Sequence, residues 1–134
     1  MEETVKILIV DDDEVDRMAI RRALKAAGVK MEWSECYNCA SAIATLQQQQ
    51  FDCVFLDYRL PDGDGLSLVQ QVRQLGITVP LVVLTGQGDE QIAVQVMKAG
   101  ACDYLSKSKL TPDALYQILR YTLRLHRAEI EAAI

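Results

Sequence analysis

The sequence predicts an α/β fold, with a doubly wound parallel sheet of five strands and five helices, the last of which is extended. Strand-type and helix-type segments alternate along the whole chain, with one helix after each strand. Residues 7–10 and 53–56 are continuous apolar runs, which are typical of strands that helices cover on both faces. No repeat or internal linker interrupts this alternation.

The strands are predicted from short runs of apolar or β-favouring residues that turn residues delimit. They cover residues 6–10, 31–36, 53–56, 81–84 and 101–105. The first ends before three consecutive aspartates, and the third ends at Asp57. The fourth begins after Pro80 and ends before Thr85 and Gly86.

The helices are predicted from apolar residues at helical spacing between capping and stop signals. They cover residues 14–27, 39–49, 66–75 and 89–99, and residues from Pro112 to the end of the chain. Gly28, Gly76 and Gly100 are the stop signals of the first, third and fourth helices. Asn38 is a suitable N-cap for the second helix, and Thr111 for the last.

The composition indicates a soluble protein with one domain. Half of the 134 residues are apolar, which suffices for a core and leaves no length for a separate output domain. The net charge of −5 argues against direct binding to nucleic acid. No signal-peptide pattern follows the acidic start, and no apolar run reaches the ~18 residues of a membrane span. We therefore expect a cytoplasmic protein without membrane contact.

The cysteines are interpreted as structural thiols. Cys53 lies within an apolar run, and Cys36 and Cys39 form a single C-x-x-C pair. Zinc or redox chemistry would favour a second pair or nearby histidines, whereas the single histidine, His126, is far along the chain.

Polar residues follow four of the five strands at the points where these end. They are Asp11, Asp12, Asp13, Asp57, Thr85 and Lys107. Asp13 is expected to cap the first helix. The carboxyl ends of parallel strands meet at one edge of the sheet, so the others are predicted to form one site. Several carboxylates together are a site for a hard divalent cation, and Lys107 and Thr85 add groups that can bind phosphoryl oxygens around an aspartate.

Over residues 5 to about 124, the sequence resembles the receiver domains of two-component response regulators, the family of the bacterial chemotaxis regulator. The resemblance lies in the motifs ILIVDDD, VFLDYRLPDGDGL, VVLTG and GACDYLSK, which occur in the order and spacing of the family. It implies a flavodoxin-like fold with strand order 2-1-3-4-5.

The resemblance also implies a role for each site residue. Asp57 corresponds to the phosphoacceptor, and Lys107 to the lysine that binds the phosphoryl group. Asp11, Asp12, Asp57 and the backbone carbonyl of Arg59 correspond to the Mg²⁺ ligands. Thr85 and Tyr104 correspond to the switch pair.

The implied function is a phosphorylation-dependent signalling switch. A histidine kinase or phosphotransfer protein would donate the phosphoryl group in a Mg²⁺-dependent reaction, after docking on the first helix near Val15, Met18 and Ala19. The surface of the fourth helix, fifth strand and fifth helix would then change and regulate a protein target. The chain would catalyse only its own phosphorylation and dephosphorylation.

Two departures from the family pattern concern the site. Ser108 follows Lys107 where the family usually has a proline after a cis bond, so both a cis and a trans peptide are open here. Arg59 and Gln87 occupy variable positions that, in the family, tune how fast the phosphoryl group is lost.

Three other functions are weighed against the switch. Haloacid-dehalogenase-like phosphatases need an aspartate two residues after the nucleophile, where this chain has Arg59, and a cap domain that the length excludes. Flavin or nucleotide binding needs a Gly-, Ser- or Thr-rich phosphate loop, whereas the first loop is DDDE. A receiver that is never phosphorylated is disfavoured because the acids, Thr85 and Lys107 are present.

The last helix is predicted to extend beyond the domain. A receiver domain at 1–124 would leave 125–134 as a helical extension of about 15 Å. One apolar stripe, assigned to the sheet, holds Leu115, Ile118, Thr122 and Leu125. The other has coiled-coil spacing and holds Tyr116, Leu119, Leu123, His126, Ile130 and Ala133. We favour a homodimer through the second stripe; a frayed tail or a linker to a further domain are the alternatives.

Overall fold

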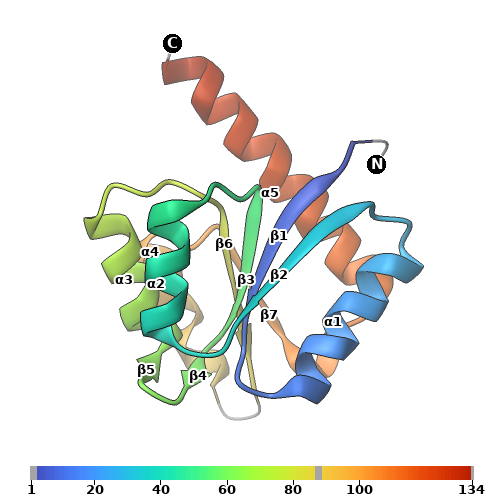
Figure 1. Cartoon of the computed structure of the whole chain (residues 1–134), viewed down its shortest axis with the longest axis horizontal. Helices are drawn as coiled ribbons and strands as arrows, with labels where there is room; N and C mark the ends of the chain where they lie inside the picture. The colour runs from blue at the N-terminus through green and yellow to red at the C-terminus, as the bar shows by residue number, and fades with distance from the viewer. Residues whose placement is uncertain (1–2, 87–88, 134) are drawn as a thin grey trace.

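The computed structural model describes residues 3–86 and 89–133 and shows a parallel sheet between two layers of helices (Figure 1). The sheet strands are β1 (Val5–Val10), β2 (Met31–Cys36), β3 (Cys53–Asp57), β6 (Leu81–Thr85) and β7 (Asp103–Ser106). Their order is β2-β1-β3-β6-β7, and all neighbours are parallel. This confirms the predicted fold and the predicted order of the five main strands. An additional short hairpin, β4 (Arg59–Leu60) and β5 (Gly63–Asp64), follows β3.

The helices cover both faces of the sheet. They are α1 (Glu14–Ala26), α2 (Cys39–Gln48), α3 (Gly65–Gln74), α4 (Ala93–Ala99) and α5 (Pro112–Ala133), with 3-10 turns η1 (Glu90–Ile92) and η2 (Lys107–Lys109). α1 and α5 lie on one face, and α2, α3 and α4 on the other (Figure 1). Each face has its own apolar core, and consecutive residues of β1 and β3 alternate between the two. The burial of both faces explains why residues 7–10 of β1 and 53–56 of β3 are all apolar.

The predicted caps are confirmed. The side chain of Asp13 accepts the N–H of Val15, and that of Asn38 accepts the N–H of Ser41. The hydroxyl of Thr111 accepts the N–H of Ala114 at the start of α5. These bonds satisfy N–H groups that the first turn of a helix leaves without partners.

The helix predicted at residues 89–99 is shorter and less regular than expected. The N–H of Ile92 donates to the carbonyl of Asp89, an i to i+3 bond, so the first residues form η1 and α4 begins only at Ala93. No side chain caps α4, because its N-cap residue is Ile92. The following strand, predicted at residues 101–105, lies at Asp103–Ser106.

The assignment of the two stripes on the last helix was right for Leu115 and Thr122, which are buried, and wrong for three other residues. Leu119 and Leu123, predicted to form a dimer seam, are buried with Leu115 and Thr122 against the protein's own core. Leu125, predicted to pack on the sheet, is exposed. The stripes interleave at spacings of three and four residues, so spacing alone does not tell which one faces the sheet.

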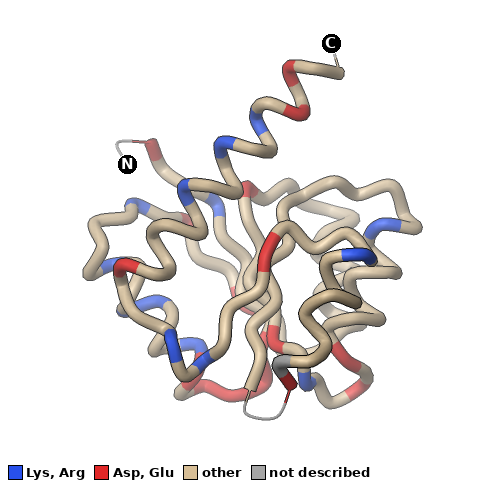
Figure 2. The backbone as a smooth tube through the Cα atoms, turned by 180° about the vertical axis from the view of Figure 1, so that it is seen from behind, with Lys and Arg blue, Asp and Glu red and all other residues tan. Residues whose placement is uncertain are grey.

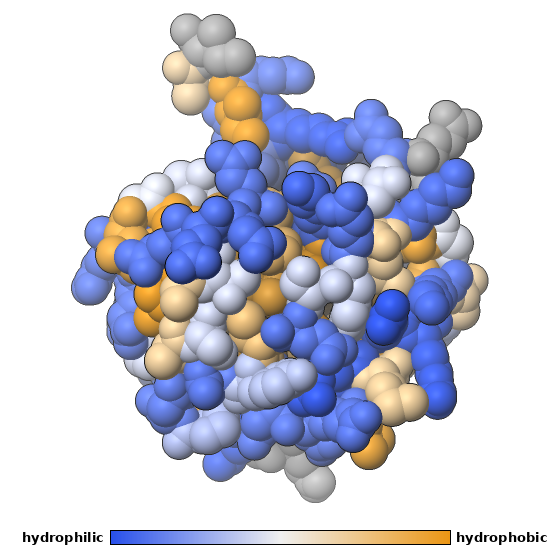
Figure 3. Space-filling model, viewed as in Figure 1, coloured by the Kyte–Doolittle hydropathy of each residue, from blue (hydrophilic) through white to orange (hydrophobic). Residues whose placement is uncertain are grey.

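Beyond Leu123, α5 continues away from the sheet. Its last turns project past the rest of the molecule, and apolar atoms show on this projecting part (Figure 3). Ile130, which belongs to it, is 51% exposed. Among the described residues, no helix is both long enough and apolar enough to span a membrane.

Candidate functional site

Three carboxylates meet at the carboxyl ends of two neighbouring strands. Asp11 and Asp12 follow β1, and Asp57 ends β3, which pairs with β1 in register. One oxygen of each lies within 4.8 Å of the others. Asp11 and Asp57 are buried, whereas Asp12 is exposed. Figure 2 shows acidic residues gathered at this lower end of the molecule.

Lys107 reaches into this acid pocket from the end of β7. Its Nζ atom lies 3.1 Å from Oδ2 of Asp57 and 3.1 Å from Oδ2 of Asp11. It lies 2.6 Å from Oδ2 of Asp16, on the first turn of α1. The structure thus brings together the acids and the lysine that the sequence placed at separate strand ends.

The Lys107–Ser108 peptide is trans, as are all peptide bonds of the described residues. The chain turns here into η2, and the hydroxyl of Ser106 accepts the N–H of Ser108 at 3.4 Å. Lys107 is thus the first residue of a 3-10 turn that Ser106 caps, and from this position its side chain contacts Asp57.

Thr85 and Tyr104 lie on neighbouring strands but in different environments. Thr85 ends β6 and is buried, and its hydroxyl oxygen has no hydrogen-bond partner among the described residues. A buried hydroxyl normally has a partner, so this one is free to donate to a bound group. Tyr104, on β7, is 42% exposed. It pairs with Val83 of β6, whereas Thr85 pairs with Ser106.

Arg59 makes a bidentate ion pair that was not predicted from the sequence. Its Nε and Nη2 atoms donate to the two carboxylate oxygens of Asp89 at 3.0 and 2.9 Å. The Asp89 side chain is only 6% exposed. The backbone N–H of Arg59 points to Oδ1 of Asp57 at 3.4 Å. The pair thus links the start of β4 to the segment that precedes η1. Gln87, the other variable position, lies outside the described residues.

Two further residues at the pocket, Asp16 and Arg17, were not predicted from the sequence. Asp16 looked like an ordinary acidic residue in the first turn of a helix. Arg17 is buried, donates from Nη1 to the carbonyl of Asp11 at 2.9 Å and stacks over Tyr37. No local signal marks either residue. The contact of Asp16 with Lys107 joins elements that are far apart in the sequence, and the contact of Arg17 with Asp11 depends on how α1 is oriented.

Burial and ion pairing act against each other in the pocket. Burial raises the pKa of Asp57 and of Asp11, and the nearby Lys107 ammonium only partly offsets this. For Lys107, burial works against the charged form, but the contacts with Asp16, Asp57 and Asp11 outweigh it and raise its pKa.

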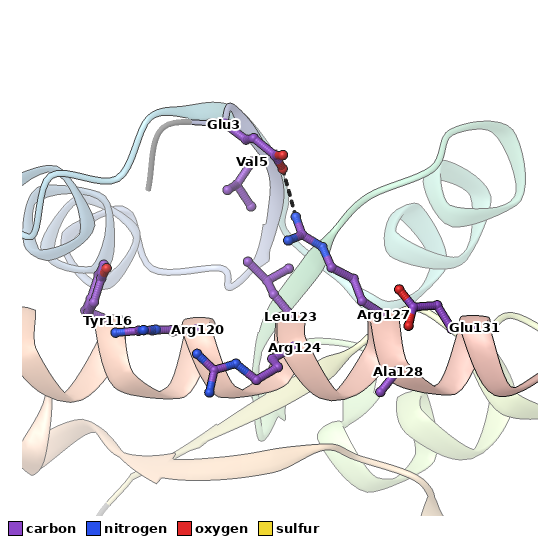
Figure 4. A pocket seen from close by; sticks show the side chains of 9 residues that line it. All are labelled: Glu3, Val5, Tyr116, Arg120, Leu123, Arg124, Arg127, Ala128 and Glu131. Carbon is purple, nitrogen blue, oxygen red and sulfur yellow. Dashed lines mark hydrogen bonds and ion pairs between the residues drawn. The ribbon is translucent and has the colours of Figure 1, made fainter.

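Two other hollows lie away from this pocket, one along α5 and one beside the end of α2. A groove of about 670 Å³ is lined by α5 and the start of the chain, where Arg127 pairs with Glu3 at 2.9 Å (Figure 4).

The thiols of Cys39 and Cys53 are buried, and burial raises the pKa of each to about 12, so they are poor nucleophiles. This agrees with the structural role expected for them.

Comparison with known proteins agrees with the fold and the pocket. Residues 7–120 match the family model of the response regulator receiver domain. The C4-dicarboxylate transport transcriptional regulatory protein DctD of Pseudomonas aeruginosa is 34% identical over 127 residues, which are 94% of this chain and 27% of DctD. RegA, the photosynthetic apparatus regulatory protein of Rhodovulum sulfidophilum, is 40% identical over 105 residues, 78% of this chain and 56% of RegA. The chain thus spans only part of these relatives.

A solved structure resembles the chain over nearly its whole length. It is the receiver domain of the sensor histidine kinase PA1611 of Pseudomonas aeruginosa PAO1, with a TM-score of 0.76 and 28% identity over 90% of this chain and 98% of that one. That structure has a magnesium ion coordinated in its active-site cleft.

The parallel sheet and the acid pocket at its edge agree with these comparisons. The chain belongs to the family of response regulator receiver domains of two-component systems. The predicted family is therefore confirmed. The predicted lack of contact with nucleic acid stays a prediction, because DctD is a transcriptional regulator and the chain spans 27% of it.

In the presence of a chelator, the Asp57→Asn variant is expected to be more stable than the wild type at neutral pH. In the folded chain, burial raises the pKa of Asp57 above its ordinary value of 3.8. At neutral pH the ionised carboxylate is therefore less favourable in the folded chain than in the unfolded chain. As the pH falls through the raised pKa, protonation stabilises the wild type, and the advantage of the variant disappears. Thermal unfolding at several pH values measures this difference, and a difference that grows towards acid pH would contradict it.

Proposed function

We propose that this receiver domain takes up one phosphoryl group on Asp57 and that this reaction switches its surface for a protein target. The observation that carries the proposal is the position of Lys107, whose ammonium lies 3.1 Å from Asp57 within a pocket of carboxylates. A fixed cation beside a strand-end carboxylate neutralises oxygens that the acids would otherwise repel.

The donor set suits Mg²⁺. Asp11, Asp12, Asp57 and the backbone carbonyl of Arg59 would hold the ion, since hard cations prefer carboxylate and carbonyl oxygens. The relative with magnesium in its cleft supports this assignment. When bound, the ion supplies positive charge next to the phosphoryl oxygens.

The remaining chemistry rests on side chains of the chain. A carboxylate oxygen of Asp57 attacks phosphorus in line, and the leaving group departs with the electron pair of the broken bond. The Lys107 ammonium donates to a phosphoryl oxygen. The Thr85 hydroxyl, which has no partner in the described residues, donates to another.

The switch follows from the charge that the phosphoryl group adds. The group would draw Thr85 towards it and leave space for Tyr104, which is exposed in this structure. It would also attract the Arg59 guanidinium, and the buried Asp89 carboxylate would then lose its partner, which favours a rearrangement before η1 and α4. Four exposed residues lie on these elements: Val94 and Met97 on α4, Tyr104 on β7 and Tyr121 on α5. We assign the target to this surface.

The partners follow from the exposed surfaces. A histidine kinase or phosphotransfer protein would dock on α1, where Val15 is 72% and Met18 42% exposed. Residues 125–134 are assigned to an extension outside domain 1–124. Homodimerisation through α5 stays a prediction, and Ile130 and Ala133 are the residues of the predicted stripe that are exposed.

The phosphatase alternative is weaker. A general acid is needed two residues after the nucleophile, whereas the guanidinium of Arg59 is committed to Asp89. A receiver that is never phosphorylated would have no use for a lysine held beside Asp57.

Incubation with acetyl phosphate and Mg²⁺ tests the proposed function. Intact-mass analysis is expected to show one phosphoryl group per chain, and chelation of Mg²⁺ should prevent its uptake. Steady hydrolysis of an unrelated phosphate ester would favour the phosphatase instead. A chain that stays unlabelled with Mg²⁺ would contradict the switch.

A further inference from the structure

Asp16 makes the shortest contact that Lys107 has in the pocket. Its Oδ2 atom lies 2.6 Å from the Lys107 ammonium, whereas the oxygens of Asp11 and Asp57 lie 3.1 Å away. Asp16 is on the first turn of α1 and Lys107 starts η2, so the contact ties two elements on opposite sides of the pocket. A contact of this length between full charges is a charge-assisted hydrogen bond.

The ammonium of Lys107 has three N–H donors. It donates hydrogen bonds to Asp11 and Asp16, and it forms an ion pair with Asp57 at 3.1 Å. The contact with Asp57 directs Lys107 to the phosphoacceptor itself, and Asp11 belongs to the cation-binding acids. Asp16 is different, because it belongs to neither group and only draws the ammonium towards α1. A phosphoryl oxygen that arrives at Asp57 competes with Asp16 for the Lys107 ammonium.

We propose that Asp16 is a positioning residue that holds Lys107 against α1 and thereby slows phosphoryl uptake on Asp57, an inference that rests on the proposed function. Without Asp16, the two contacts at 3.1 Å still keep Lys107 in the pocket. The N–H group that Asp16 now occupies is then free for the phosphoryl group.

The size of the effect is limited by solvent. The side chains of Asp16 and Lys107 are 35% and 22% exposed, so water screens part of their attraction. For a partly screened pair, we expect Asp16→Asn to raise the rate of phosphoryl uptake about fivefold.

The rate of uptake from acetyl phosphate at saturating Mg²⁺ is the first measurement. Asp16→Asn is expected to be faster than the wild type, and Asp16→Glu, which keeps the charge, to stay near the wild type. Glu14→Gln is the matched control, because Glu14 is an exposed acid of the same helical turn. It removes the same charge and is expected to leave the rate unchanged.

A double-mutant cycle separates the contact from a general charge effect. In a Lys107→Ala background, Asp16→Asn should no longer change the rate, because the contact is already lost. A readout without phosphorylation is NMR of metal-free protein labelled with ¹⁵N-lysine. The Lys107 ammonium signal, assigned by its loss in Lys107→Ala, should shift in Asp16→Asn and not in Glu14→Gln.

The outcomes distinguish this inference from the proposed function. If the wild type takes up a phosphoryl group and Asp16→Asn does so at the same rate, the role of Asp16 is overturned and the proposed function stands. The same holds if the ammonium signal does not shift, or if the rate effect persists without Lys107. If the wild type takes up no phosphoryl group, the proposed function fails and the role of Asp16 fails with it.

Discussion

Replacement of Asp57 by asparagine is expected to abolish phosphoryl uptake. The amide oxygen carries no charge and is a poor nucleophile, and the change also removes one carboxylate from the set that suits Mg²⁺. The fold should persist, because asparagine has the same shape and the buried charge of Asp57 is unfavourable in the folded chain. Intact-mass analysis after incubation with acetyl phosphate and Mg²⁺ measures the result.

Asp113→Asn is the control for this experiment, because Asp113 lies on the first turn of α5 and is not among the described acids that contact Lys107 or Asp57. It should label like the wild type. Labelling of Asp57→Asn to the same extent as the control would show that another residue accepts the phosphoryl group.

Truncation of Leu119 to alanine is expected to lower the free energy of unfolding by about 2–5 kcal/mol. The side chain of Leu119 is fully buried and packs in the core that α1 and α5 share. Its loss leaves a cavity in this core, whereas the predicted dimer seam would have placed Leu119 against a second copy of the chain. Urea denaturation of the wild type and the variant measures the difference.

Ile130→Ala is the matched variant on the projecting part of the same helix. Because Ile130 is half exposed, its truncation should change the free energy of unfolding by no more than about 0.5 kcal/mol. If Ile130→Ala destabilised the protein more than Leu119→Ala, the orientation of α5 described here would be wrong.

The fold was predictable because its signals are local. The apolar runs of β1 and β3 report burial on both faces, and capping by Asp13, Asn38 and Thr111 depends only on residues two or three positions away. Where two local signals compete, prediction was wrong. Leu119 and Leu125 both sit in regular apolar stripes, and only the packing against the core distinguishes them.

The site was predictable to the extent that strand ends define it. Asp11, Asp57 and Lys107 each follow a strand, and the rule that parallel strands end at one edge brings them together. Asp16 and Asp89 lie on helical turns or loops, and their pairing with Lys107 and Arg59 depends on the path of the backbone between elements. No residue pattern encodes such contacts, so only the structure shows them.

The central claim, that Asp57 is the phosphoacceptor, is tested most directly by locating the phosphoryl group in the wild type. An aspartyl phosphate is an acyl phosphate, so borohydride reduction converts the labelled residue to homoserine, which peptide mass mapping locates. The result expected is conversion at Asp57 and at no other aspartate, dependent on both acetyl phosphate and Mg²⁺. Conversion at Asp11 or Asp12 with Asp57 unmodified would contradict the account.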